Sequence, residues 1–319
     1  MFSLVIRGMT MFDLESLTAH YLDIWQYQRN LSPKTLKAYR IDLRQFTDFM
    51  KMTDGDLNKT NLSDYITHLH KSYKPRSAKR KIACIKSFCS CLEQDDVIEK
   101  NPFSKIRTKF QEPFCLPKTI PFDEIQEIFT AAYSELRSSD KGSFEHRKCI
   151  RDVAVLELLF ATGMRVSELC SLKTEDVNLS DHYIIINGKG SKERVVHIGN
   201  RSVIRALNMY RSAFWEKISE SDYFFLNRLD NRLSEQSVRA MVSKYADKAD
   251  ISRHITPHMF RHSFATLLLE EDVDIRYIQQ VLGHSSIVTT QIYTHVTSKK
   301  QKHILTEKHP RNRIVICED

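Results

Sequence analysis

Four short segments of this 319-residue chain hold side chains whose types could act together on a phosphodiester. They lie at residues 161–169, 188–190, 258–261 and 282–293. Between them they supply two guanidinium groups, one amine, two imidazoles and one phenol: Arg165, Arg261, Lys189, His258, His284 and Tyr293. A single phenol accompanied by this many cationic and imidazole groups indicates covalent phosphoryl transfer.

The phenol and the two guanidinium groups have the properties of a nucleophile and a phosphate clamp. A tyrosine can attack a phosphate and keep the energy of the broken bond as a phosphotyrosine ester, so the strand can be resealed without ATP. Charge then gathers on the non-bridging oxygens, and planar, permanently charged guanidinium groups neutralise it with paired hydrogen bonds. We therefore expect Tyr293 to attack while Arg165 and Arg261 hold the phosphate.

The remaining three residues could move the protons that this reaction requires. The leaving sugar oxygen must gain a proton, and the phenol, with a reference pKa of about 10, must lose one. Lys189, His258 and His284 are the candidates for these roles. We expect no metal and no cofactor, because arginine and lysine supply the positive charge that Mg²⁺ supplies elsewhere.

Five longer segments surround these residues and carry a resemblance to a known family. The chain resembles the tyrosine recombinase, or phage integrase, family, and most closely its Xer-type site-specific recombinases. The resemblance extends from about residue 13 to about residue 311, and its segments are residues 31–39, 161–169, 188–194, 256–266 and 282–296. In that family the six matching positions are the arginine pair, the hairpin lysine, the two histidines and the nucleophilic tyrosine.

The resemblance implies a fold and a reaction. The fold would be mainly α with a small β-hairpin, in a two-domain, C-shaped DNA clamp of a helical core-binding domain and a tyrosine recombinase catalytic domain. The reaction would be conservative cleavage and rejoining of DNA through a 3′-phosphotyrosine intermediate and a Holliday junction. The partners would be double-stranded DNA with inverted half-sites and three further protomers in a homo-tetramer, or in a hetero-tetramer with a second recombinase.

Three readings of the biological and chemical role stay open at this stage. Xer-like dimer resolution and integration or excision of a mobile element are both compatible with the resemblance. A catalytically silent DNA-binding architectural or regulatory protein is an alternative, although the complete set of six residues argues against it. A type IB topoisomerase-like enzyme is the third, and relaxation of random plasmid would distinguish it from a recombinase.

The charge of the chain favours a nucleic-acid partner. The formal net charge is +8, and residues 1–118 hold 20 Lys and Arg against 13 Asp and Glu, while residues 119–319 hold 28 against 27. Phosphate neutralisation by Lys and Arg is the main sequence-independent source of DNA affinity and makes that affinity salt-dependent. The first third of the chain is therefore the expected place for much of the DNA affinity.

Changes in composition and helix-breaking prolines divide the chain into five parts. We expect an N-terminal extension at 1–12, a helical core-binding, SAM-like domain at 13–105, a proline-containing linker at 106–120 and a catalytic domain at 121–298. The resemblance implies that a C-terminal tail at 299–319 docks on a neighbouring protomer. The interval 131–151 is longer than the compact Xer pattern, and we expect a loop insertion there.

One helix of the first domain has two faces that can be read from its spacing. Ser32 and Pro33 have the form of a helix start, and residues 36, 39, 43, 46 and 49 then form an apolar stripe at intervals of three and four. Basic residues follow a second stripe, and another basic cluster at residues 71–81 opens a later helix. A solvated charged face is the alternative to DNA contact. The predicted DNA-contacting residues are Lys37, Arg40, Arg44, Arg76, Lys79, Arg80 and Lys86.

Local patterns in the catalytic domain place the reactive residues on particular elements. β-branched segments at 182–187 and 192–198 flank a glycine turn, which predicts a hairpin with Lys189 at its tip. Arg165 is expected at a helix start, where an anion is favoured, with Glu168 either orienting it or serving only as a first-turn acid.

Spacing places the second arginine and the tyrosine on helices as well. His258 and Arg261 are spaced i, i+3 after a proline and share a helical face, whereas His262 points about 100° away and is excluded from the site. His284 lies nine residues before Tyr293, next to serines suited to capping the helix that carries the tyrosine.

The cysteines and the apolar segments indicate the cellular compartment of the protein. Seven cysteines are scattered without a paired CxxC framework, so neither a zinc site nor a disulfide framework is expected. The first residues do not form a secretory signal, and the longest apolar stretch, 153–164, is far shorter than a membrane span. These observations predict a cytoplasmic protein.

Overall fold

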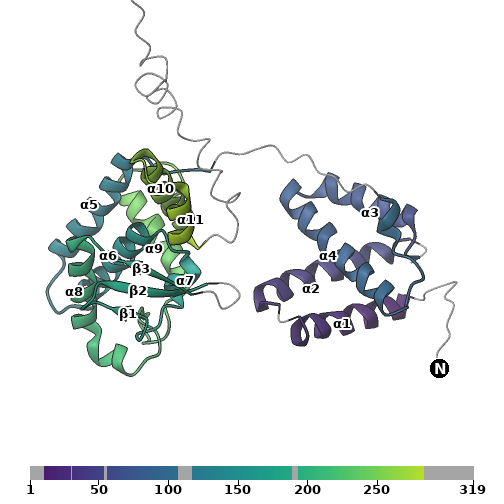
Figure 1. Ribbon diagram of the computed structural model, residues 1–319, viewed down its shortest axis with the longest axis horizontal. Helices are drawn as coiled ribbons and strands as arrows, with labels where there is room; N and C mark the ends of the chain where they lie inside the picture. The colour runs from purple at the N-terminus through teal and green to yellow at the C-terminus, as the bar shows by residue number, and fades with distance from the viewer. Residues whose placement is uncertain (1–10, 30, 54–55, 107–116, 189–192, 284–319) are drawn as a thin grey trace, which may run out of the picture. The chain divides into compact units, whose positions relative to one another are not determined.

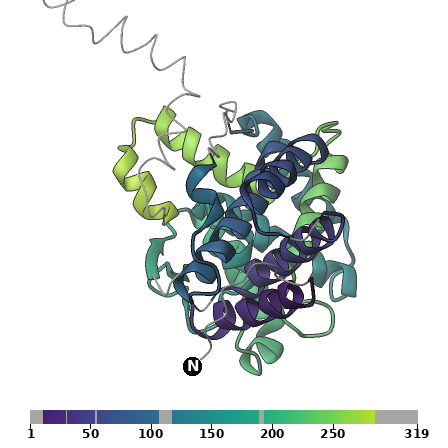
Figure 2. The same cartoon turned by 90° about the vertical axis from the view of Figure 1, so that its right-hand side faces the viewer.

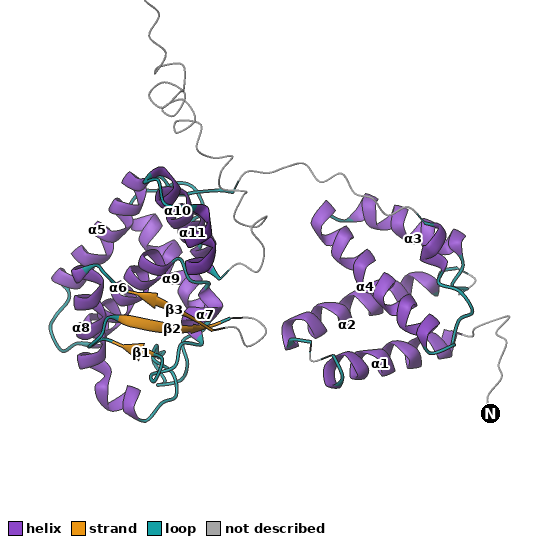
Figure 3. Cartoon of the chain, in the orientation of Figure 1, coloured by secondary structure: helices purple, strands orange, loops and turns teal. Residues whose placement is uncertain are grey.

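The chain forms two compact units, which divide between Phe114 and Cys115. The computed structural model describes residues 11–29, 31–53, 56–106, 117–188 and 193–283 (Figure 1). Helices make up most of both units, and within the described residues the strands lie in the second unit alone (Figure 3). The prediction of a mainly α chain with one small β-hairpin is confirmed.

The first unit consists of four α-helices and one short 3-10 helix in its described part. They are α1 (Met11–Tyr27), α2 (Pro33–Met50), α3 (Lys59–Ser72), α4 (Pro75–Gln94) and η1 (Pro102–Lys105). α2 begins as the sequence predicts: the Ser32 hydroxyl accepts a hydrogen bond from the backbone N–H of Thr35, and Pro33 occupies the first helical position. α1 and α2 lie side by side (Figures 1 and 2).

Large aromatic side chains fill the core of the first unit. Trp25, Tyr21, Phe46 and Phe88 are almost fully buried, and the rings of Tyr21 and Phe88 meet edge to face with their centroids 5.4 Å apart. The apolar stripe predicted for α2 faces this core, since Leu36, Leu43 and Phe46 are buried and Tyr39 and Phe49 are half-buried. Burial of this stripe fixes which face of α2 remains for its basic residues.

A buried ion pair joins α2 to α4 inside this unit. Asp42 is fully buried, and its carboxylate accepts hydrogen bonds from Lys81, at 2.9 Å, and from the guanidinium of Arg80. Lys81 is 2% exposed and also contacts Gln45 and the ring of Tyr73. Within the basic cluster at residues 71–81, Lys81 therefore faces the core and does not belong to an exposed basic surface. Lys81 lies on the same helical face as the buried residues Ile85 and Phe88, so its side chain points inward, where Asp42 binds it.

The second unit is built around α6 (Phe144–Thr162), whose central residues 153–156 and 158–159 are buried almost completely. Helices α5 (Phe122–Ser138), α8 (Arg201–Ser219), α9 (Glu235–Lys248) and α10 (Pro257–Glu270) pack on it, and α7 (Val166–Cys170) and α11 (Ile275–Leu282) are shorter. Because the central part of α6 is buried on all sides, α6 is the central element of this unit.

A small antiparallel sheet completes the second unit in the order β1 (Val177–Asn178), β2 (Tyr183–Asn187), β3 (Glu193–His197). β2 and β3 form the predicted hairpin, with Ile184 opposite Val196 and Ile186 opposite Arg194. Ile184, Ile186 and Val196 are buried and hold the sheet against the core. The sequence does not predict β1, because two residues are too few to show an alternation.

The loop insertion expected over 131–151 is wrong for most of that interval. α5 continues to Ser138 and α6 starts at Phe144, so only residues 139–143 lie between the two helices. Ser143 caps α6 by accepting a hydrogen bond from the backbone N–H of His146. None of the helices that the structure describes combines the length and the apolar composition that a membrane-spanning helix requires.

Removing the Asp42 carboxylate is expected to destabilise the first unit strongly. In D42A the buried Lys81 loses its main counter-charge, and breaking a buried pair from one side costs about 3–5 kcal/mol. Urea unfolding followed by Trp25 fluorescence measures this, in a W215F background, because Trp25 and Trp215 are the chain's two tryptophans and Trp215 is exposed. The control is D42L/K81M, which replaces both partners by apolar groups and should lose less stability than D42A. A D42A loss under about 1 kcal/mol would contradict the pair's structural role.

Candidate active site

A sharp turn between α6 and α7 places Arg165. α6 ends at Thr162 and is capped by Gly163, which has a φ of +58° in the left-handed region. A Cβ atom at this position would lie 2.5 Å from Cδ1 of Phe264 and 2.9 Å from Cδ2 of Leu282, so the turn requires glycine for its conformation and for its contacts. Arg165 follows two residues later as the N-cap of α7, the helix start that the sequence predicts.

Glu168 holds Arg165 from the first turn of α7. Its carboxylate accepts hydrogen bonds from the backbone N–H of Arg165 at 2.8 Å and from Nη1 of the same residue at 2.7 Å. The side chain of Glu168 is 6% exposed, whereas that of Arg165 is 36% exposed. Of the two roles left open by the sequence, the structure gives Glu168 the orienting role, and it caps the helix with the same carboxylate.

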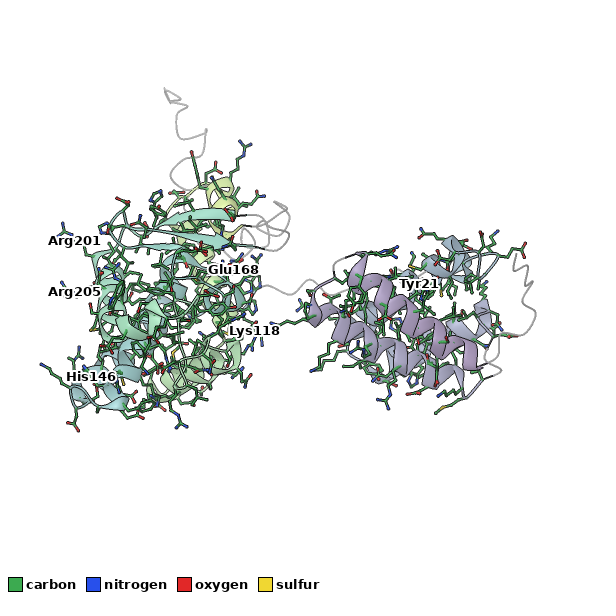
Figure 4. All side chains as sticks on the ribbon, turned by 90° about the horizontal axis from the view of Figure 1, so that it is seen from below. Tyr21, Lys118, His146, Glu168, Arg201 and Arg205 are labelled. Atoms are coloured by element: carbon green, nitrogen blue, oxygen red, sulfur yellow. The ribbon has the colours of Figure 1, made fainter. Side chains whose placement is uncertain are left out.

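A third residue, Arg194 of β3, binds the same carboxylate. Nη2 of Arg194 lies 2.7 Å from Oε2 of Glu168 and Nη1 lies 3.2 Å from Oε1, while Nε donates to the carbonyl of Val281 at 2.8 Å. Burial raises the pKa of Glu168, but the hydrogen bonds from Arg194 and from the backbone of Arg165 outweigh it, and the pKa lies below its ordinary value. Figure 4 labels Glu168 in the second unit, beside the sheet.

The sequence prediction of the site missed Arg194, although the strand pattern carries a signal for it. Alternation in β3 puts residue 194 on the same face as Val196, and Val196 is buried. A charged residue at an inward position of a strand needs a buried partner. Glu168 is that partner. Because it lies 26 residues before Arg194, a pattern read over a few residues cannot predict the pair.

Arg261 lies in the interior and binds backbone carbonyls. It is 3% exposed, and Nη1 donates to the carbonyl of Gly163 and Nη2 to the carbonyl of Leu282, each at 2.7 Å. These two bonds connect α10 with the turn before Arg165 and with the end of α11. The predicted contact of Arg261 with a phosphate stays a prediction.

His258 lies one turn before Arg261, at the exposed start of α10. Desolvation by the surrounding protein lowers the pKa of His258, and the positive charges of Arg261, Arg239 and Arg165 lower it further. The imidazole is therefore neutral at pH 7 and able to accept a proton. Arg239 of α9, which the sequence analysis did not select, pairs with Glu235 at 2.7 Å.

His262, which the sequence analysis excluded from the site, has a different environment. Burial, together with His258 and Arg261, lowers the pKa of His262 to about 4. It is uncharged at neutral pH, and its exclusion from the site stays a prediction.

Within the ranges that the structure describes, no group of three or more His, Cys, Asp or Glu side chains could hold a metal ion.

Lys189, His284 and Tyr293 lie outside the described residues. The elements that lead to two of them are described. β2 ends at Asn187, two residues before Lys189, and α11 ends at Leu282, with Gly283 as its cap at a φ of +64°. Arg194 and Arg261 bind the carbonyls of Val281 and Leu282, so the last turn of α11 is part of the same polar network as Arg165.

The predicted DNA-contacting residues of the first unit lie on α2 and α4. Lys37, Arg40 and Arg44 are exposed on α2, beside the face that packs into the core. On α4, Arg76, Lys79 and Lys86 are exposed, and the guanidinium of Arg80 is exposed in part while it is bound to Asp42. Their contact with DNA stays a prediction.

The chain matches known families and proteins over most of its length. Residues 118–300 match the phage integrase family, and residues 19–95 match the family described as phage integrase, N-terminal SAM-like domain. A tyrosine recombinase of Agathobacter rectalis is 50% identical over 302 residues, which cover 94% of this chain and 98% of that protein. Tyrosine recombinase XerD of Listeria innocua is 36% identical and covers 94% of this chain and 100% of its own length.

A solved structure shares the fold. The site-specific recombinase XerH, in a post-cleavage complex with a palindromic difH substrate, matches with a TM-score of 0.73 and 22% sequence identity, over 94% of this chain and 85% of that one. At this identity the likeness concerns the fold alone.

Replacing Gly163 by alanine is expected to destabilise the second unit by about 2–5 kcal/mol. The left-handed conformation costs a non-glycine residue roughly 1–2 kcal/mol, and overpacking against Phe264 adds about 1–3 kcal/mol. Gly142 is the matched control, since its φ is +84° but no heavy atom would lie within 4 Å of a Cβ atom there. G142A should lose only the conformational part, about 1–2 kcal/mol. Differential scanning calorimetry of both variants measures the difference, and equal losses would contradict the packing argument.

Proposed function

Since this chain belongs to the phage integrase family and is a site-specific tyrosine recombinase, we propose that Tyr293 is its nucleophile and that Arg165, Lys189, His258, Arg261 and His284 assist it. One observation carries the proposal. Arg165, His258 and Arg261, which are up to 96 residues apart in the sequence, are brought together: Arg261 bonds the turn that places Arg165, and the charges of both arginines lower the pKa of His258.

The proposed first step breaks one DNA strand and keeps its bond energy. The Tyr293 oxygen attacks the scissile phosphorus, a 3′-phosphotyrosine bond forms, and the bond to the 5′-oxygen breaks. Lys189 gives the leaving oxygen its proton. The neutral imidazole of His258 receives the phenol proton, and His284 contacts the phosphate.

The two arginines are proposed to stabilise the charge on the phosphate during this step. Arg165 is the more exposed of the two, and its guanidinium bonds only one oxygen of Glu168 among the contacts described above. Arg261 gives two N–H groups to backbone carbonyls, and we propose that its guanidinium also contacts the phosphate. Preorganised donors of this kind are a large part of electrostatic catalysis.

The second step is the reverse attack on a partner strand. The freed 5′-hydroxyl attacks the phosphotyrosine of a neighbouring protomer, which releases that tyrosine and joins the two strands. One round yields a Holliday junction and a second round resolves it. Each protomer cleaves one strand, so two duplexes with two inverted half-sites each require four protomers.

We propose a homo-tetramer on double-stranded DNA with inverted half-sites, and a hetero-tetramer with a second recombinase as the alternative. The related XerH was solved on a palindromic site, which supports inverted half-sites. The C-terminal tail at 299–319 is proposed to dock on the neighbouring protomer. The boundaries of the core-binding domain (13–105), linker (106–120) and catalytic domain (121–298) are part of the same proposal, as is a cytoplasmic location.

The biological role within the family is proposed as either dimer resolution or integration and excision of a mobile element. The relatives named XerD and tyrosine recombinase are compatible with both. The relatives that are named tyrosine recombinases match over nearly their whole length, which argues against the two alternatives from other classes, a binding-only architectural protein and a relaxing topoisomerase. Covalent capture at a single site would exclude the first, and absence of relaxation on random plasmid would exclude the second.

Replacing Tyr293 by phenylalanine is expected to abolish the covalent intermediate and leave DNA binding intact, because only the nucleophilic oxygen is lost. The assay uses duplexes nicked near inverted repeats from the gene's own neighbourhood, and the protein–DNA adduct is detected under denaturing conditions. We expect the adduct rate to fall by at least about 10³-fold.

Tyr277 of α11 offers a matched control for this experiment. It is 67% exposed and lies on the same segment of the chain, and Y277F should form the adduct at the rate of the unmodified protein. Retained adduct in Y293F would refute the assignment. An adduct mapped by mass spectrometry to a residue other than Tyr293 would refute it as well.

The basic face of α2 is expected to account for part of the salt dependence of DNA binding. Each phosphate contact removed should lower the slope of log K against log salt by about 0.9, so R40Q/R44Q should lower it by about 1.8. Fluorescence anisotropy between low and moderate salt measures the slope. K51Q removes one positive charge and is the control for each of the single variants R40Q and R44Q, because Lys51 is paired with Glu15 and Asp48. An unchanged slope in R40Q/R44Q would show that this face does not contact phosphates.

A further inference from the structure

We propose that Arg194 is a positioning residue of the active site: it offsets the charge of Glu168, so that the charge of Arg165 stays available to the phosphate. This inference rests on the proposed role of Arg165. The side chain of Arg194 is 10% exposed, so it acts from the interior rather than from the DNA-facing surface.

The geometry of Arg194 uses all three of its nitrogens. Two of them face the two oxygens of Glu168 as a fork, at 2.7 and 3.2 Å, and Nε donates to the carbonyl of Val281 at 2.8 Å. Bidentate pairs of this kind fix orientation as well as charge. Glu168 is thereby held by two guanidinium groups, and each of its oxygens accepts two hydrogen bonds.

The charge balance of the three side chains explains why a second arginine is needed. Glu168 is almost fully buried, and alone with Arg165 it would form a neutral pair that attracts a phosphate only weakly. With Arg194 the group of three carries a net positive charge. At an effective dielectric constant of about 20, one unit charge about 7 Å from a phosphate contributes on the order of a 50-fold difference in an equilibrium or rate constant.

Arg194 also reaches the last turn of α11, and the chain makes room for it there. A Cβ atom on Gly283 would lie 2.9 Å from Nη1 of Arg194 and 3.0 Å from its Cδ. Glycine at this position thus lets the guanidinium pass to Glu168 while Nε binds the carbonyl of Val281. One side chain therefore connects β3, the start of α7 and the end of α11.

The test compares R194M, E168Q and R194M/E168Q in the nicked-duplex assay, at saturating DNA. R194M should form the adduct about 10- to 100-fold more slowly than the unmodified protein, because Glu168 then neutralises Arg165. In R194M/E168Q the unbalanced negative charge is gone, and the rate should recover by about tenfold or more relative to R194M. A merely structural Arg194 would give no such rescue, and R194M and the double variant would then be equally slow.

The pH dependence gives a second readout of the same effect. Without Arg194, the buried Glu168 loses the partner that keeps its pKa low, so its protonation at mildly acid pH should free Arg165. The ratio of the R194M rate to the unmodified rate should therefore rise as the pH falls. The ratio of the R194M/E168Q rate to the E168Q rate should not change with pH. A ratio that is constant with pH in both backgrounds would overturn the proposal.

Two further variants keep the result interpretable. If R194M does not fold, R194K takes its place: it retains a positive charge without the planar fork, and it should cleave within about tenfold of the unmodified protein. A folded R194K as inactive as R165A would overturn charge compensation. R165A distinguishes the failure of one proposal from the failure of the other. Full activity in R165A would refute the role of Arg165 itself. An inactive R165A together with a fully active R194M would refute only the role of Arg194.

Discussion

The burial of one carboxylate, that of Glu168, is the constraint on which the rest of the site depends. An ionised carboxylate out of water is costly unless it is paired and hydrogen-bonded. Glu168 meets this condition with the backbone and side chain of Arg165 and with the fork of Arg194. Because these groups come from the start of α7 and from β3, the requirement to pair one acid holds two parts of the site in a fixed relation.

The position of α11 depends on polar contacts in the same way. Its apolar residues Ile278 and Leu282 belong to a small cluster with α10 that is separate from the main core of the second unit. A helix of eight residues is not stable alone. Arg194 and Arg261 bind the carbonyls of its last turn, which is the negative end of the helix dipole. Two guanidinium groups thus add to the apolar contacts of α11, which are the small cluster and the packing of Val281 against the main core.

The sequence predicted what local patterns determine and missed what distant contacts determine. The start of α2 and the hairpin of β2 and β3 follow from Ser32, Pro33 and β-branched alternation, which act over a few residues. Arg261, by contrast, bonds Gly163, which lies 98 positions away, and no local pattern reveals such a contact. The burial of Lys81 could not be predicted for the same reason, since its partner Asp42 lies on another helix.

A further pair of long-range hydrogen bonds fixes the first described residues of the second unit. The backbone N–H of Ile120 donates to Oγ of Ser263 at 2.6 Å, and that hydroxyl donates back to the carbonyl of Ile120 at 3.1 Å. Ser263 is buried on α10, two residues after Arg261. The first residues of the unit are therefore fastened to the helix that carries His258 and Arg261. A change in the path of the chain at Ile120 must break buried hydrogen bonds on that helix, so the entry point and the site share one rigid element.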